Sequence, residues 1–237
     1  MDPKLIKQEA KARVKEHGFS PYFMAFVPAI LIGMLSGFIS GVLGDESITG
    51  IVISFILGAS YPFFVSVSFL RMSREDNFTN NQFIEDEVKP NGLRYALGGI
   101  LTNLYTFLWT LLFIVPGIIK SFSYILTAFI LKDDKSIGIN DAIKKSREMM
   151  DGKKLQVFGM YMSYFAWVLV AGITFWITLA IFFATMISGI FLGGAVTTLA
   201  IILFILLAFS GISFLALIIK YTPRWHMAIA LYYDEIK

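Results

Sequence analysis

The chain alternates long apolar stretches with shorter polar segments. Several apolar stretches run for about 20 residues without a charge, the length that crosses about 30 Å of hydrocarbon as a helix. Outer-membrane barrels show short alternating segments instead, so the pattern disfavours a barrel. It predicts an all-α, polytopic transmembrane bundle in a single integral-membrane domain, 1–237. The six expected spans are about 21–43, 48–70, 95–115, 118–131, 155–185 and 197–219.

The fourth apolar stretch is the shortest, and a helix break is expected just before it at Pro116-Gly117. Residues 118–131 would form about 21 Å of helix at 1.5 Å per residue, too short to span alone. The basic residues nevertheless favour a return across the membrane here, because such residues collect on the cytoplasmic side. We expect a short span or a re-entrant helix, with both termini cytoplasmic. All Lys and Arg residues except Lys120 lie in the polar segments 1–20, 71–94, 132–154 and 220–237.

Three polar segments have amphipathic patterns. Residues 1–20 predict an interfacial helix, residues 139–151 a cytoplasmic amphipathic helix, and residues 223–237 an amphipathic tail whose depth in the membrane stays open. The segment 71–94 is rich in Asn, with Pro and Gly near its end, so it is expected to be a loop. Only its part near 82–88 has the pattern of a short helix.

Composition narrows the classes of function. The sequence has no cysteine, which excludes disulfides, thiolate metal sites and thiol nucleophiles. His17 and His226 lack carboxylates at ligand spacing, so no metal site is expected. Neither a Gly-x-Ser-x-Gly elbow nor a phosphate-binding Gly-rich loop is present. The formal charge of +3 is explained by topology and gives no reason to expect nucleic acid. We therefore expect a non-enzymatic protein without a cofactor.

Lys120 stands out because a cation within or beside an apolar stretch is costly unless it is paired or hydrated. In one interpretation it binds an anionic headgroup or substrate, together with Tyr124 and with Asn103 and Thr106 of the third span. In the other, Lys120 lies at the outer interface with its stem along the helix and its ammonium among headgroups. Asn103 and Thr106 equally fit hydrogen-bonded contacts between helices.

The helix expected at 139–151 carries a second group of candidates on its polar face. Lys144, Lys145 and Arg147 would present positive charge to a partner protein or to anionic lipid. A solvated helix face beside the membrane explains the same charges without a partner.

The stretches Pro116 to Tyr124 (PGIIKSFSY) and Asp141 to Met150 (DAIKKSREMM) resemble a bacterial integral-membrane family of uncharacterised function, the domain-of-unknown-function family numbered 975. The basic N-terminal helix and the closing Ala-x-x-Tyr-Tyr-Asp-Glu fit the same resemblance. The family is also similar to the membrane portion of some glycerophosphodiester phosphodiesterases. The resemblance implies a bacterial plasma-membrane protein of about six helices and supplies no catalytic residues.

Two functions follow as expectations. The first is a plasma-membrane protein that binds or transports a lipid-like, amphiphilic or small anionic ligand at Lys120, Asn103, Thr106 and Tyr124. The second is an accessory protein that binds another membrane component through the loop 71–94 and the helix 139–151 with its Lys144, Lys145 and Arg147. The resemblance implies a role for such a protein in envelope stress or antimicrobial-peptide tolerance. Membrane lipids are expected partners in both.

Overall fold

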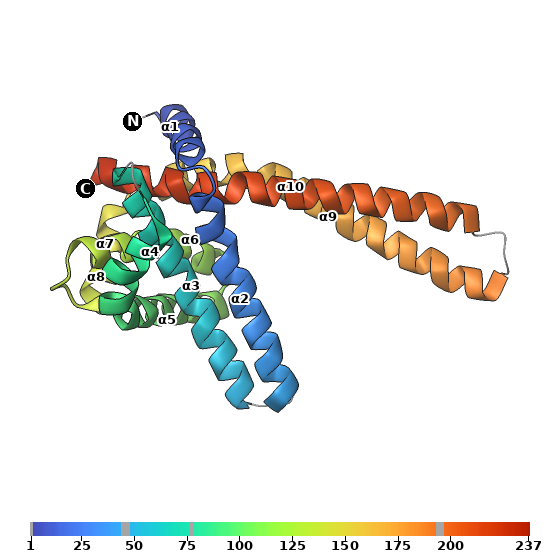
Figure 1. Cartoon of the computed structure of the whole chain (residues 1–237), viewed down its shortest axis with the longest axis horizontal. Helices are drawn as coiled ribbons and strands as arrows, with labels where there is room; N and C mark the ends of the chain where they lie inside the picture. Colours follow the sequence, from blue (N-terminus) through green and yellow to red (C-terminus); the bar gives the residue numbers. More distant parts are fainter. Residues whose placement is uncertain (1, 44–47, 76–77, 193–196) are drawn as a thin grey trace. The chain divides into compact units, whose positions relative to one another are not determined.

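The computed structural model describes residues 2–43, 48–75, 78–192 and 197–237, and these residues form helices without any strand (Figure 1). Six helical stretches are long and apolar enough to cross a membrane, so the predicted all-α fold is confirmed. In chain order the helices are α1 (Pro3–Glu16), α2 (Ser20–Leu43), α3 (Ile48–Arg74), α4 (Asn80–Phe83), the π-helix η1 (Ile84–Val88), α5 (Lys89–Leu112), α6 (Ile114–Tyr124), α7 (Thr127–Asp133), α8 (Ile139–Met149), α9 (Lys154–Leu192) and α10 (Thr197–Ile236).

The chain divides into two compact units. The first contains residues 1–158 together with 223–237, and the second contains residues 159–222. Helices α9 and α10 each contribute one end to the first unit and the remainder to the second. All the sites discussed below lie in the first unit.

Helix α3 packs against both α2 and α5 in the first unit. Its contact with α5 is close because α5 presents Gly98 and Gly99 at the crossing. A methyl group at Gly99 would lie 3.1 Å from the Cα of Ser60 and closer still to the carbonyl oxygen of Ala59. The Asn103 amide donates to that same carbonyl at 3.2 Å. Small residues thus let two apolar helices approach until a side chain can bond the opposing backbone.

The helix break near Pro116-Gly117 lies at Phe113, where the backbone is extended with φ −159° and ψ 144°. Pro116 falls in the first turn of α6, where its missing N–H costs no helical hydrogen bond. Gly117 lets α6 pack directly on Thr110 of α5. A second interruption separates α6 from α7, so the fourth apolar stretch runs as two short helices from Ile114 to Asp133.

The prediction of a loop at 71–94 is wrong for most of this segment. Helix α3 continues to Arg74, and helical structure resumes at Asn80 and runs without a gap into α5. Pro90 is tolerated because it occupies the first turn of α5. The Tyr95 hydroxyl donates to Glu87 at 2.8 Å and supports this turn from the inside. Tertiary contacts therefore override the local preference of Asn, Pro and Gly for loops.

Helix α1 begins as its sequence suggests, with Asp2 accepting a hydrogen bond from the Lys4 amide at 2.9 Å. Its apolar residues Ile6, Ala10 and Val14 are buried, so protein covers the face that was expected to contact the lipid leaflet. His17 donates through Nε2 to the Met72 carbonyl at 2.7 Å, which fixes the end of α1 to α3.

The predicted amphipathic tail is the last part of α10, which continues through Pro223 to Ile236. Its side chains Trp225, Met227, Tyr232 and Tyr233 are buried. The ring of Tyr233 lies 5.2 Å from that of Phe129 between centroids. The tail is thus part of the core of the first unit and not a surface appendage.

The second unit consists of the long α9–α10 hairpin (Figure 1). Its two helices pack through glycines that each face an aromatic ring of the other helix: Gly172 faces Phe214, and Gly211 faces Phe175. The rings of Phe175 and Phe214 stack at 6.1 Å between centroids. Large outward side chains such as Trp167 and Trp176 remain exposed, as expected where lipid is the solvent.

Candidate functional site

The predicted polar stripe on the third span, now α5, forms contacts within and between helices. Besides its bond to Ala59, the Asn103 amide donates to the Gly99 carbonyl at 2.9 Å. The Thr106 hydroxyl donates to the Thr102 carbonyl at 2.9 Å, one turn back on the same helix. Both side chains are half-buried with these donors in use. Asn103 thus links α5 to α3, whereas the bond of Thr106 lies within α5. A part for these two residues in ligand binding stays a prediction.

Lys120 lies on α6 and directs its ammonium over the ring of Trp109, 4.5 Å from the centroid. This cation–π contact stabilises a charge beside an apolar stretch without any carboxylate. Tyr124, one turn further along α6, is buried. Lys120 and Asn103 therefore have different neighbours, and the structure does not join the four predicted ligand-binding residues into one pocket.

Helix α8 shows the predicted amphipathic arrangement, with Ala142, Ile143 and Ser146 buried. The Ser146 hydroxyl accepts from the Leu126 amide at 3.2 Å and donates to the Ser123 carbonyl at 2.9 Å. These two bonds fasten α8 across the interruption between α6 and α7.

The basic residues Lys144, Lys145 and Arg147 are exposed on the opposite face of α8. Among the residues that the structure describes, their charged groups form no ion pair. They therefore present an open positive face.

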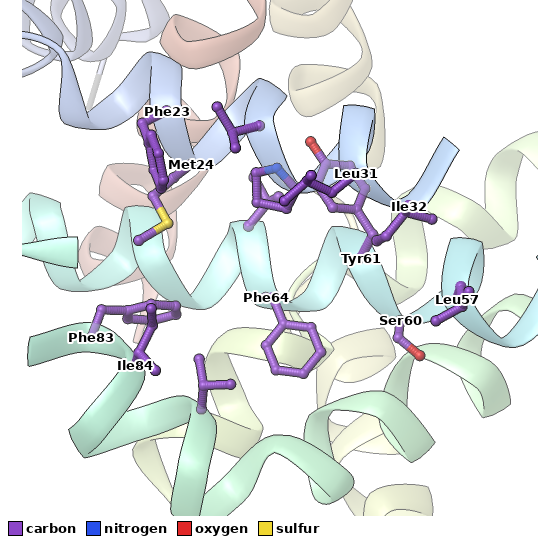
Figure 2. Close-up of a pocket in the computed structure, with 14 residues that line it drawn as sticks. Phe23, Met24, Leu31, Ile32, Leu57, Ser60, Tyr61, Phe64, Phe83 and Ile84 are labelled. Carbon is purple, nitrogen blue, oxygen red and sulfur yellow. The ribbon is translucent and has the colours of Figure 1, made fainter. Parts of the chain in front are cut away.

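No pattern in the sequence predicted an apolar pocket of about 390 Å³ that lies between α2, α3, α4 and η1. Figure 2 shows its walls, and we call it the α2–α3 pocket. The side chains that line it include Met24, Pro28, Leu57, Phe64 and Ile84. All are apolar residues within an apolar protein, so no pattern in the sequence distinguishes them from ordinary core or lipid-facing positions.

Two polar side chains line the α2–α3 pocket, and both already have partners. The Ser60 hydroxyl donates to the Ile56 carbonyl at 2.7 Å. The Tyr61 hydroxyl donates across to the Ala25 carbonyl of α2. The pocket therefore offers an occupant apolar contact and little hydrogen bonding, and its volume falls in the range of small-ligand sites.

A network of charged side chains closes one end of the first unit. Arg74 at the end of α3 donates to both carboxylate oxygens of Asp133, at 2.6 and 2.9 Å, and to both of Asp234, the Nε bonds measuring 3.0 and 3.1 Å. Asp133 also accepts from the Tyr233 hydroxyl at 3.1 Å and from Lys237 at 2.6 Å. These bonds join the ends of α3, α7 and α10, and we call them the Arg74 cluster. With its donors and acceptors mutually paired, the cluster has a structural role.

A turn beside this cluster is held by Asp134. Its carboxylate accepts from the Ser136 hydroxyl at 2.6 Å, from the Ser136 amide at 3.0 Å and from the Ile137 amide at 3.2 Å. The hydrogen bond from the Ser136 hydroxyl, followed by that from the Ser136 amide, lowers the pKa of Asp134 below its ordinary value. Arg94 donates to the carbonyls of Asp134 and Ile137 and completes the turn.

No group of three or more His, Asp or Glu side chains in the described part of the chain is arranged to hold a metal ion.

Comparison with known proteins gives one match. The model of the family described as "Protein of unknown function (DUF975)" matches residues 1–237, the whole chain. No curated protein and no solved structure matches it. The similarity to the membrane portion of glycerophosphodiester phosphodiesterases stays a prediction.

Proposed function

We propose that this chain, which belongs to the DUF975 family, is a non-enzymatic membrane protein that binds a lipid-like or amphiphilic molecule in the α2–α3 pocket. The observation that carries the proposal is the pocket itself, about 390 Å³ in volume with its two lining hydroxyls already bonded inside the protein. The proposed site thus moves from Lys120 and Asn103 to side chains that the sequence did not mark.

The chemistry of the walls supports an acyl chain as the occupant. Aromatic rings from three elements, Phe23 of α2, Phe64 of α3 and Phe83 of α4, line the pocket among aliphatic side chains. An acyl chain gains no hydrophobic free energy on leaving lipid for such a pocket, because lipid tails are equally apolar. Retention therefore depends on packing against these walls, so it should be sensitive to the shape of the pocket.

The test fills the pocket and compares a matched control one residue away. Leu57→Trp places an indole into the pocket, whereas Ile56→Trp places it on the exposed side of the same helix. Each variant is reconstituted with a phospholipid carrying a photoreactive diazirine on its acyl chain. After illumination, peptide mass spectrometry measures labelling at Phe64 in the pocket and at the exposed Phe55.

We expect Leu57→Trp to lower labelling at Phe64 while labelling at Phe55 stays unchanged. Ile56→Trp should leave Phe64 as in the wild type. If the two tryptophan variants label Phe64 equally, the pocket does not hold the acyl chain and the proposal fails.

The exposed face of α8 supports a second candidate function, that of an accessory protein which binds another membrane component. Lys144, Lys145 and Arg147 point away from the core without an ion pair among the described residues. Reversal of charge in Lys144→Glu/Lys145→Glu should abolish binding of such a partner in an affinity pull-down while leaving Phe64 labelling intact. A partner that survives this reversal would contradict the accessory role of α8.

The distribution of basic residues supports a bacterial plasma-membrane location with both termini in the cytoplasm. A cysteine in place of Lys135 is then shielded from an impermeant thiol reagent in intact cells, and the natural lack of cysteine keeps the background low. A cysteine in place of Ser47, which lies outside the described residues, should react. The opposite labelling pattern would invert the orientation.

A further inference from the structure

A small hollow of about 250 Å³ lies where α1, the start of α2 and the last part of α10 meet in the first unit. It is lined by three cationic side chains, Lys11, Lys15 and Arg224, together with Tyr22 and the main chain around Gly18. No carboxylate is among its lining residues. We call it the Arg224 hollow, and it is distinct from the α2–α3 pocket.

Arg224 is the unusual member, because its Nε is buried and has no hydrogen-bond partner. Arg74 and Arg71 of the first unit use their guanidinium groups in ion pairs: Arg74 bonds two aspartates, and Arg71 bonds Glu75 and Asp86. Arg94 also has a buried, unbonded Nε, but its other guanidinium nitrogens donate to main-chain carbonyls. A buried, charged donor without an acceptor is costly and calls for an explanation.

Lys11 and Lys15 add two more positive charges to that of Arg224. Lys11 and Lys15 are one turn apart on α1, so their charges repel each other along the same helix face. Within the described residues neither ammonium forms an ion pair, and neither does the guanidinium of Arg224. Three like charges around one hollow leave the protein without the counter-charge that would stabilise them.

We infer that the Arg224 hollow binds a phosphate oxyanion. The planar guanidinium can donate two parallel hydrogen bonds to phosphate oxygens, and the two ammonium groups act as flexible positive charges beside it. Tyr22, which also lines the hollow, carries a hydroxyl that can donate a further hydrogen bond. A phosphate supplies both the negative charge and the acceptor oxygens that the hollow lacks.

Two sources of this phosphate share the same chemistry, a lipid headgroup and free inorganic phosphate. The headgroup is favoured by position, because Tyr22 lines the hollow while the next residues of α2, Phe23 and Met24, line the apolar α2–α3 pocket. One end of α2 therefore contributes to a cationic site and to an apolar one. The oxyanion site stands on its own charges and does not depend on the occupant of the pocket.

The test uses native mass spectrometry of the full chain in a neutral maltoside detergent. The probes are phosphatidylglycerol, phosphatidylcholine and inorganic phosphate, each titrated separately. Lys15→Gln/Arg224→Gln removes two charges from the hollow. The double variant Lys89→Gln/Lys135→Gln removes the same charge from two exposed positions outside the hollow and serves as the control.

We expect Lys15→Gln/Arg224→Gln to weaken phosphatidylglycerol binding by about tenfold or more, since it removes charge-assisted hydrogen bonds. The Lys89→Gln/Lys135→Gln control should bind as the wild type does. Lys11→Gln, at an exposed position, should give a smaller loss in the same direction.

Competition separates the two sources. If inorganic phosphate displaces phosphatidylglycerol from the wild type, the hollow accepts free phosphate, and if it does not, the hollow is specific for the lipid headgroup. Both results support an oxyanion site. Equal losses in the hollow variant and in Lys89→Gln/Lys135→Gln would mean unspecific charge attraction and would overturn the inference, as would unchanged binding in all variants. Leu57→Trp leaves the hollow intact, so failure of the acyl-chain proposal does not alter these outcomes.

Discussion

Replacing Gly99 by alanine tests the close crossing of α3 and α5 on which the first unit depends. The added methyl group would lie 3.1 Å from the Cα of Ser60 and 3.2 Å from the carbonyl carbon of Ala59. Its nearest neighbours are main-chain atoms of another helix, which cannot turn aside as a flexible side chain could. The two helices must therefore separate by at least a few tenths of an ångström.

Three terms set the change in the free energy of unfolding, two of them destabilising and one stabilising. Overpacking of this kind costs about 1–3 kcal/mol, and loss of the Asn103 bond to Ala59 adds about 0.6 kcal/mol, the average for hydrogen bonds between membrane helices. Alanine regains about 1 kcal/mol because it is the better helix former. We expect Gly99→Ala to lower the free energy of unfolding by about 0.6–2.6 kcal/mol.

The control is Gly58→Ala on α3, where no described atom lies within 4 Å of an added methyl group. Its helix propensity alone should make it neutral or stabilising by up to about 1 kcal/mol. Both variants are unfolded by titrating sodium dodecyl sulfate into maltoside micelles, with tryptophan fluorescence as the readout. Equal stabilities for Gly99→Ala and Gly58→Ala would refute the close helix crossing.

Two further predictions concern the polar end of the first unit. Arg74→Gln should destabilise by about 2 kcal/mol in the same titration, because it removes charged hydrogen bonds from the largely buried Asp133. Lys89→Gln, which breaks an exposed pair with Glu85, should cost no more than about 0.5 kcal/mol. Similar losses of stability in Arg74→Gln and Lys89→Gln would contradict the structural role of the Arg74 cluster. Ser136→Ala should raise the pKa of Asp134 towards its ordinary value, measured by NMR titration of the carboxyl carbon. The pKa of Asp134 is lower in the folded than in the unfolded protein. The contribution of the turn to stability is therefore present above the ordinary pKa and is lost as the pH falls through the folded pKa. A carboxyl pKa that the substitution leaves unchanged would exclude Ser136 as the cause.

Local sequence features succeeded where a local rule governs the outcome. The length and hydrophobicity of the apolar stretches predict six membrane-spanning helices, because hydrocarbon leaves a chain few alternatives to a helix. The amphipathic pattern at 139–151 predicts α8, and its charged face is exposed as expected. Asp2 and Pro3 likewise predict the start of α1.

Local features failed where distant parts of the chain compete with them. The Asn-rich segment after Arg74 was expected to be a loop, yet helix resumes at Asn80, next to Phe78, whose ring contacts that of His17 at 6.5 Å between centroids. The amphipathic pattern after Pro223 left the depth of the tail open, yet its side chains are buried in the first unit, where Tyr233 packs on Phe129. Neither contact is visible in a window of neighbouring residues.

The candidate site shows the same difference between what local sequence features predict and what only the fold reveals. Lys120 drew attention because an isolated charge in an apolar stretch is visible in the sequence, but its partner, Trp109, became known only from the fold. Nothing in the pattern marks Leu57 or Phe64 as walls of a pocket, since an apolar residue reads alike whether it faces core, lipid or cavity.

The sequence by itself determined the all-α fold class and the number of helices long and apolar enough to cross a membrane. Each of these depends on hydrophobicity and helix length, which are sums over neighbouring residues. Only the tertiary structure decided which charges pair and which do not. Arg74 meets Asp234, 160 residues away, whereas Arg224 is left in a cationic hollow formed with α1. Such pairings depend on how helices pack, and packing is a property of the whole chain.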